Sequence, residues 1–179
     1  MGILLAPKPA KLFLGMISGK PDLFTECTRL FVQKFGPVDL VSNLTSWDHS
    51  EYYQNEMGIG LLRRFIFFEQ LVDPELLVAV KHLAITIEAD FSLPAPEARR
   101  RINLDPGYLT EAKVVLATTK DFPHRIYIGR NIYAESTLHY HKDRRSFKPV
   151  EHTYPDFRTE DSLKLFNRAR ELLRYRLRQ

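Results

Sequence analysis

Apolar and polar residues follow one another along the first half of the chain in blocks that predict strands and helices in turn. Residues 11–19 form a short apolar run ended by glycine, which is typical of a buried strand. The next segment begins with Pro21, ends at Gly36 and repeats its apolar residues at helical spacing, so we expect a helix there. The apolar face of that helix holds Leu23, Cys27, Leu30 and Phe31.

Four further elements are expected in this half: strands over 38–44, 60–71 and 102–109, and a helix over 73–91. Asp73 suits the N-cap of that helix, with a proline at its first position. We interpret the polar, aromatic stretch before the second of these strands as irregular chain that leads into a strand at 50–57. The order strand-helix-strand-strand-helix-strand is that of the ferredoxin-like fold. For residues 1–110 we therefore predict an antiparallel sheet with two helices on one face.

The second half of the chain predicts a β-meander followed by a helix. Turn residues separate short segments of strand character over 113–119, 125–129, 132–140 and 146–152. The last of these is expected at an edge, because Pro149 has no N–H to give to a ladder. Thr159 begins a final helix with one apolar face. The predicted fold class is α+β, in a single domain over 1–179: a ferredoxin-like core over 1–110, extended by a β-meander and a C-terminal helix over 111–179.

The hairpin around residues 129–131 divides its side chains between two faces. Pairing about a three-residue loop sets Ile128 opposite Ile132 and Arg125 opposite Glu135. One face collects apolar residues that we expect in the core: Ile126, Ile128, Ile132, Ala134 and Leu138. The other face collects polar ones: Arg125, Tyr127, Tyr133, Glu135, Thr137, His139 and His141. This polar face is either a solvated surface with a cross-strand ion pair or a binding site.

A binding site on this face would suit an anion. Arginine offers a bidentate fork, lysine a point charge, and hydroxyl groups complete the coordination of a phosphate. We therefore expect an anionic small molecule such as a nucleotide. Its candidate ligand-binding residues come from the hairpin, the turn before it and a preceding strand: Lys120, His124, Arg125, Tyr108, Tyr133 and Thr137.

Acidic residues and histidines supply candidates for catalysis and metal binding. Glu135, His124 and Asp105 are the candidate acid–base residues. Asp105, Glu135 and Asp156 are the candidate ligands of a Mg²⁺ ion that arrives with a nucleotide, because hard cations prefer oxygen. Two simpler interpretations stay open: residues 105–108 (DPGY) fit a β-turn, and the histidines at 139 and 141 fit either a transition-metal pair or plain surface.

Composition and charge describe the setting of this site. The chain has one cysteine, which suits a reducing cytoplasm, and no apolar run of the length of about 18 residues that a membrane span needs. We expect a cytoplasmic protein without membrane contact. Residues 1–98 carry 8 Lys/Arg and 12 Asp/Glu, whereas residues 99–179 carry 18 and 10. This asymmetry favours an anionic partner for the second half, or it is ordinary surface charge.

Several stretches of the chain, taken in order, resemble a known family. They are YYQNEMG, INLDPGYL, KVVLATTKDFPHRIYIG, IYAESTL and TYPDF. Together they resemble DUF4416, a bacterial and archaeal family without an established activity, some of whose members are labelled GTP-binding protein. The chain has no G-x-x-x-x-G-K-[ST] motif, so such a label would need another basis. The motif positions that the resemblance carries over are Asn103, Asp105, Gly107, Tyr108, Lys120, His124, Arg125, Tyr133, Glu135, Thr137, Tyr154 and Asp156.

Three functions are compatible with these features. The first is a protein that binds a nucleotide or another phosphate-bearing ligand, with or without catalysis. The second is RNA binding, since a ferredoxin-like sheet with exposed aromatic residues can stack bases, although the RNP signature is missing. The third is a non-catalytic protein-interaction domain that uses the aromatic segment 47–57. The sequence does not indicate an oligomeric state.

Overall fold

The fold is seen in a computed structural model that describes residues 2–48, 51–94 and 100–179. Its elements in chain order are β1 (Ala10–Ser18), α1 (Pro21–Phe35), β2 (Val38–Val41), β3 (Thr45–Ser46), α2 (Glu51–Met57), β4 (Leu62–Val72), η1 (Pro74–Leu76), α3 (Leu77–Asp90), β5 (Asn103–Leu109), β6 (Lys113–Thr118), β7 (Ile126–Gly129), β8 (Ile132–His141), β9 (Ser146–Pro149), α4 (Pro155–Arg158) and α5 (Glu160–Arg176). Within these described ranges, no helix combines the length and the apolar character needed to cross a bilayer.

One antiparallel sheet organises the molecule, and it confirms the predicted fold class. Its strand order is β2-β4-β1-β5-β6-β8-β7, with β3 paired to β4 and β9 paired to β8. The first four positions, β2-β4-β1-β5, together with the crossovers through α1 and α3, are the ferredoxin-like arrangement. The strands β6, β8 and β7 extend this sheet without a break, so the β-meander shares one sheet with the ferredoxin-like part.

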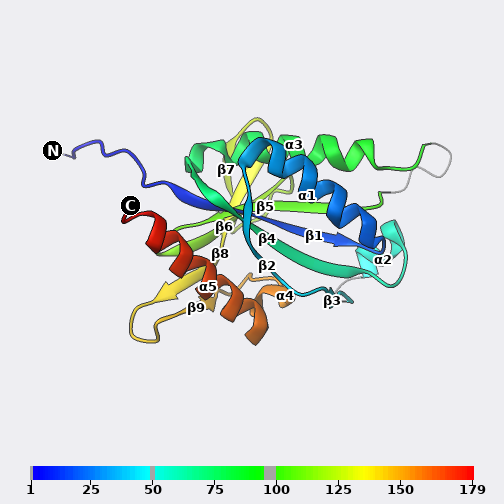
Figure 1. Cartoon of the computed structure of the whole chain (residues 1–179). Helices are drawn as coiled ribbons and strands as arrows, with labels where there is room; N and C mark the ends of the chain where they lie inside the picture. The colour runs from blue at the N-terminus through cyan, green and yellow to red at the C-terminus, as the bar shows by residue number, and fades with distance from the viewer. Residues whose placement is uncertain (1, 49–50, 95–99) are drawn as a thin grey trace.

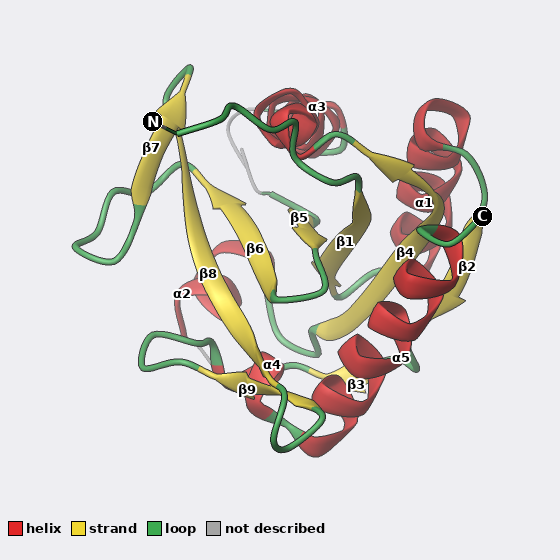
Figure 2. Cartoon of the chain, turned by 90° about the vertical axis from the view of Figure 1, so that its left-hand side faces the viewer, coloured by secondary structure: helices red, strands yellow, loops and turns green. Residues whose placement is uncertain are grey.

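Helices cover the sheet on both sides (Figures 1 and 2). Because strand side chains alternate, Leu12 and Leu14 of β1 face α1 and α3, whereas Phe13 faces α5. The first core holds Phe24 and Phe31 of α1, and the second holds apolar residues from β4 and α5: Phe65, Phe67, Phe166, Ala169 and Leu173. The sheet face opposite α1 and α3 is therefore buried beneath the C-terminal helix.

The stretch before β4 differs from its prediction. Residues 51–57 form the short helix α2 rather than a strand, and residue 50 lies outside the described residues. Tyr53 and Met57 lie four residues apart, so a helix turns both toward the cluster of Ile17, Trp47 and Leu61. Packing of this helical pair explains why the tyrosine-rich composition did not produce a strand.

The DPGY stretch at 105–108 is a continuous part of β5 and not a turn. Pro106 pairs with Leu14 of β1 and stands just before the ladder with β6, which begins at Gly107. A Cβ atom at Gly107 would lie 2.4 Å from both the Phe13 ring and the Val115 carbonyl oxygen. The glycine is therefore needed for the close approach of neighbouring strands rather than for a reversal of the chain.

The β7–β8 hairpin keeps much of its predicted register but has a shorter turn. Tyr127 pairs with Tyr133 as predicted, whereas Ile132 pairs with Gly129 instead of Ile128. Arg130 and Asn131 form the turn with φ of 51° and 61°, which is the type I′ geometry that suits the twist of a hairpin. The additional residue at Ile128 is accommodated by an irregularity in the ladder.

The predicted apolar face of this hairpin is wrong for three residues. Ile126 and Ile128 are 72% and 37% exposed, because β7 is the last strand of the sheet. Leu138 is buried, but on the α5 side, since the β6–β8 ladder shifts its register between Val114 and Val115. That bulge reverses the alternation along β8, so Leu138 and Ile132 belong to different clusters.

Candidate functional site

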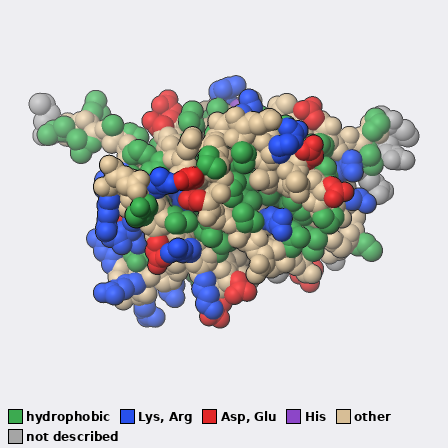
Figure 3. All heavy atoms as spheres, in the orientation of Figure 1, with side chains coloured by type: hydrophobic (Ala, Val, Ile, Leu, Met, Phe, Trp, Pro, Cys, Tyr) green, Lys and Arg blue, Asp and Glu red, His purple; other side chains and the backbone are tan. Residues whose placement is uncertain are grey.

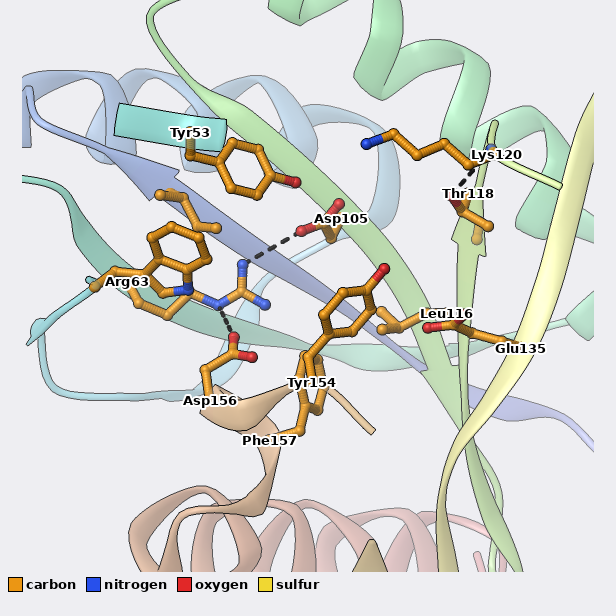
Figure 4. A pocket seen from close by; sticks show the side chains of 13 residues that line it. Tyr53, Arg63, Asp105, Leu116, Thr118, Lys120, Glu135, Tyr154, Asp156 and Phe157 are labelled. Atoms are coloured by element: carbon orange, nitrogen blue, oxygen red, sulfur yellow. Dashed lines mark hydrogen bonds and ion pairs between the residues drawn. The ribbon is translucent and has the colours of Figure 1, made fainter. Parts of the chain in front are cut away.

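A small polar pocket opens on the α5 side of the sheet (Figure 4). It lies where the central strands meet Trp47 and the α2 residue Tyr53 on one side and residues Tyr154–Phe157, at the start of α4, on the other. Its residues are Ile17, Trp47, Tyr53, Arg63, Asp105, Leu116, Ala117, Thr118, Lys120, Glu135, Tyr154, Asp156 and Phe157. The cavity volume is about 70 Å³.

Arg63 of β4 forms one wall of the pocket, although it lies within the core and is only 3% exposed. Its Nη1 is 3.4 Å from Asp105 Oδ2, and its Nε is 3.0 Å from Asp156 Oδ2. The guanidinium carbon stands 4.3 Å from the centroid of the Phe65 ring. Gly15 of β1 leaves the space for it, since a Cβ there would lie 2.8 Å from Arg63 Nη2. Two carboxylates and an aromatic face thus compensate the burial of this charge.

Asp105 is held by further groups from β5 and α3. Its Oδ2 accepts a hydrogen bond from Asn103 Nδ2 at 2.7 Å, and its Oδ1 is 3.8 Å from Lys81 Nζ. Asn103 Oδ1 in turn accepts from Arg100 Nη1 at 2.9 Å and from the Tyr53 hydroxyl at 3.4 Å. Burial raises the pKa of Tyr53 above its ordinary value, so the phenol stays protonated and remains a donor beside the carboxylate.

Glu135 of β8 forms the facing wall. Its Oε2 accepts from Arg125 Nε at 2.7 Å and lies 3.1 Å from His124 Nε2. Arg125 also donates through Nη1 to the Lys120 carbonyl at 3.0 Å and through Nη2 to the Tyr154 hydroxyl at 2.7 Å. Arg125 and Glu135 therefore share one side of the sheet beside a pocket, as the hairpin pattern predicted, and the arginine fixes the loop that carries Lys120.

The side chains of Tyr154 and Lys120 complete the pocket. The Tyr154 hydroxyl points toward its centre, and the Lys120 side chain extends across it toward Tyr53 and Asp105 (Figure 4). The backbone N–H of Lys120 donates to Thr118 Oγ1 at 3.2 Å, which fixes the chain at the end of β6. Burial, and to a lesser extent the Glu135 carboxylate, raises the pKa of Tyr154, so this phenol also stays neutral.

The structure gathers some of the predicted ligand-binding residues and separates others. Lys120 lines the pocket, and His124 and Arg125 stand behind Glu135. Tyr108, Tyr133 and Thr137 are not among the lining residues: Tyr108 packs in the cluster on the α3 side, Tyr133 packs against Tyr127 with ring centroids 5.4 Å apart, and the Thr137 carbonyl accepts from Thr153. Of the predicted acid–base residues, Asp105 and Glu135 line the pocket and His124 does not.

The predicted metal ligands lie around one pocket but do not form a metal-binding group. Asp105, Glu135 and Asp156 all line it, and each has an arginine or lysine partner that competes with a cation. Across the described part of the chain, no three His, Cys, Asp or Glu residues come together in a way that could hold a metal ion. His139 bonds to Ser136, on the other side of the sheet from Glu135. Each carboxylate would have to exchange an arginine or lysine partner for the cation, and a Mg²⁺ ion that arrives with a nucleotide stays a prediction.

Sequence reasoning missed Arg63, Trp47 and Tyr53 as site residues. A signal existed for Arg63, because period-two alternation along β4 places it on the same face as Phe65 and Phe67. A charge on a core face must have partners, and those partners stood far away in the sequence at 105 and 156. Tyr53 gave no such signal, since its helix was interpreted as a strand.

A larger groove adjoins the pocket. It has a volume of about 540 Å³ and shares Trp47, Arg63 and Asp156 with the pocket, so the Arg63–Asp156 ion pair stands between the two hollows. The rest of its lining comes from the β2–β3 region, from β4 and from the first half of α5 with its N-cap: Leu40, Val41, Ser42, Asn43, Thr45, Ser46, Phe65, Thr159, Asp161, Ser162, Lys164, Leu165 and Arg168.

These features define an α+β protein with a ferredoxin-like core whose second sheet face is covered and whose polar pocket opens beside that cover. The sequence profile of the family described as "Domain of unknown function (DUF4416)" matches residues 8–173. The chain belongs to this family, as its motifs indicated. Comparisons with curated proteins and with solved structures gave no significant match.

Proposed function

We propose that this protein binds a phosphate-bearing small molecule such as a nucleotide, with the phosphate in the polar pocket and the rest of the ligand in the adjoining groove. The observation that carries the proposal is the convergence of one lysine, two neutral phenols and a threonine on a cavity of small volume. Lysine supplies a positive charge, and hydroxyl groups donate to the remaining phosphate oxygens.

The charge balance of the pocket supports an anionic ligand. Each lining carboxylate has a cationic partner within 4 Å: Arg63 and Lys81 for Asp105, Arg63 for Asp156, and Arg125 for Glu135. Lys120 joins Arg63, Lys81 and Arg125 as a fourth cationic side chain at or behind the pocket wall. Because each carboxylate is already paired with an arginine or a lysine, a phosphate that enters the pocket is not repelled by an unpaired negative charge.

The sizes of the two hollows support the division of the ligand. A water molecule occupies about 30 Å³ in the liquid, so a cavity of about 70 Å³ has room for a group of about two waters' volume, such as a single phosphate group, and not for a nucleoside. The groove of about 540 Å³ falls within the range of about 300–1,000 Å³ that is usual for small-molecule sites. A nucleoside would have to lie in the groove, beside Trp47 and Phe65.

RNA binding stays a prediction without support from the sheet. Phe13 and Phe67, in the middle of the face opposite α1 and α3, are buried beneath α5 and are not exposed for base stacking, whereas Tyr127 of the edge strand β7 is 57% exposed. Lys and Arg side chains do gather where α5 ends near the β8–β9 hairpin (Figure 3). The exposed ones there are Lys142, Arg144, Arg145, Arg174 and Arg178.

Thermal-shift and calorimetric titrations test the proposal. ATP, GTP, AMP, GMP, guanosine and inorganic phosphate are compared, each with and without Mg²⁺. We expect the phosphate-bearing compounds to raise the midpoint of unfolding and guanosine to have little effect, because a ligand that binds only the folded state stabilises it by mass action. Nucleotides are expected to bind more tightly than inorganic phosphate, since only they fill the groove.

Two lysine variants make the test specific. Lys120→Ala removes the pocket's lysine, and Lys113→Ala removes an exposed lysine from the start of β6, the strand that leads to Lys120. The first variant should lose the nucleotide response while keeping its circular dichroism spectrum, and the second should respond like wild type. Flat titrations for wild type with every phosphate compound would overturn the proposal.

A further inference from the structure

The outermost strand of the sheet, β7, presents an unusual edge. It is the last strand in the sheet order, and none of the described helices or strands lies beyond it (Figure 2). Its sequence, IYIG, has neither a charged residue nor a proline, and Ile126, Tyr127 and Ile128 are 72%, 57% and 37% exposed. Free backbone groups beside exposed apolar side chains are a template for pairing with another strand.

The opposite edge of the same sheet is protected. Pro37 precedes β2, and Asp39 within it forms an ion pair with Lys11 at 2.6 Å. A proline and a charged residue are devices by which an edge strand avoids pairing with other chains. One edge thus carries these devices and the other does not, although both belong to one sheet.

The β7 edge is complementary to itself. When two copies pair antiparallel about Tyr127, each Ile126 stands opposite the Ile128 of the second copy, and the two Tyr127 side chains stand opposite each other. Ile126 and Ile128 lie on the α3 side, where Ile126 pairs with Ala134 and Ile128 lines a hollow beside α3. Such cross-strand pairs of branched and aromatic residues are favourable.

The hollow beside β7 adds a second complementary feature. It has a volume of about 580 Å³ and lies between η1, the start of α3 and the hairpin. Its lining includes the acidic side chains of Asp73 and Glu75, the basic side chain of Arg130 and the exposed Leu76. In the described part of the chain, Arg130 forms no ion pair with either acid. A patch with both charge signs can face its own copy without repulsion, whereas a patch of one sign cannot.

We infer that two copies of this chain associate along β7, by antiparallel strand pairing about a two-fold axis perpendicular to the sheet. The nine-stranded sheet then continues from one copy into the other. The axis places the two hollows on the same side of the joined sheet, where each receives apolar and charged groups of the other copy. The polar pocket does not include β7, so this association is independent of the proposed ligand.

Sedimentation velocity over a range of protein concentrations tests this inference. Wild type is expected to shift from monomer to dimer as the concentration rises. Ile126→Lys and Ile128→Lys each place a charge on the edge and should keep the protein monomeric over the same range. The matched control is Val41→Lys, at a residue 49% exposed on the opposite edge strand, and this variant should dimerise like wild type. Circular dichroism checks that each variant is folded.

Disulfide trapping tests the register. Tyr127→Cys should form a covalent dimer under mild oxidation, because residue 127 meets its own copy at the two-fold axis. The background is low, since the native Cys27 is fully buried and burial raises the pKa of its thiol to about 12. Tyr175→Cys, at an exposed position on α5, should stay monomeric. A wild type that is monomeric at every concentration, or lysine variants that dimerise like wild type, would refute the inference.

Discussion

Arg63 and Arg125 stand on opposite sides of one pocket, and they are held there in different ways. Arg63 projects from the middle of β4 into the core, with its carboxylate partners at 3.0 and 3.4 Å. Arg125 precedes the edge strand β7 and has closer partners: a carboxylate at 2.7 Å, a backbone carbonyl at 3.0 Å and a phenol at 2.7 Å. The first arginine joins distant parts of the sheet, whereas the second arranges a loop. We therefore expect removal of the first mainly to affect stability and removal of the second mainly to affect binding.

The largest effect is expected from Arg63→Met. The substitution preserves much of the side-chain volume but leaves Asp105 and Asp156 without their shared cation, and breaking a buried ion pair on one side costs about 3–5 kcal/mol. Asp105 keeps Lys81 and some solvent contact, so we expect about 3 kcal/mol, measured as the loss in free energy of unfolding in urea.

The neighbouring arginine provides the control for this loss. Arg64 points to the other side of β4, is partly exposed, and lies 5.9 Å from the Phe24 ring centroid. Arg64→Met should lower the free energy of unfolding by less than about 1 kcal/mol. If both variants lost the same free energy of unfolding, the ion pairs of Arg63 would add nothing to stability beyond what any arginine in this strand contributes.

An intermediate effect on stability is expected from Arg125→Met. The variant loses three hydrogen bonds and, among the described residues, leaves the buried Glu135 with His124 as its partner, which we expect to cost about 2 kcal/mol in urea unfolding. Lys120 and Tyr154 also lose the group that fixes them, so the nucleotide-induced thermal shift should disappear while the protein remains folded. Arg144→Met, at an exposed site in the β8–β9 hairpin, should change neither quantity. Retained binding in Arg125→Met would mean that the pocket does not depend on this arginine.

The smallest effect concerns pH and Glu88 of α3, whose Oε1 accepts from the N–H of Leu104, the residue before Asp105. Burial raises the pKa of Glu88, although Lys81, the Leu104 N–H and Arg100 partly oppose the rise. A carboxyl group with a raised folded-state pKa is neutral in both states at low pH. It penalises the folded state as pH rises from the unfolded pKa of about 4.3 through the folded value.

Glu88→Gln removes this penalty. The free energy of unfolding of the variant, relative to that of wild type, should therefore be higher at about pH 7 than at about pH 4, which lies near the ordinary glutamate pKa. Urea unfolding of both proteins at the two pH values gives the measurement. A difference between them that does not change with pH, or that moves in favour of wild type, would contradict a raised pKa.

The fold was more predictable from the sequence than the site. Alternation and helical spacing are local signals, and they were sufficient for the ferredoxin-like order and for the Arg125–Glu135 pairing. They failed where packing decides. Helix α2 forms because Tyr53 and Met57 pack on Trp47. Gly107 is needed because a side chain there would collide with the ring of Phe13 on the neighbouring strand β1. The bulge opposite Val114 and Val115 changes which side of the sheet the following side chains of β8 point to, and no residue pattern in the sequence indicates it.

The site depends on residues that approach one another only after folding. Lys120, Asp105, Glu135 and Asp156 were candidates because of their chemistry, but the sequence could not place them around one cavity. It also could not show that Arg125 is bonded to protein groups, since that follows from the position of Tyr154 in a later segment. Arg63 could have been recognised in another way. Its position on a core face of β4 implies that it has acidic partners, even though the sequence does not show which residues they are.

The C-terminal helix has a consequence for both folding and recognition. By sealing the second side of the sheet, α5 converts a two-layer domain into a three-layer sandwich, and the segment that leads into it, Tyr154 to Phe157, is also a rim of the cavity. A chain that ended before Thr159 would uncover the phenylalanine cluster and open the rim in the same event. We therefore expect that loosening this helix also opens the cavity to solvent.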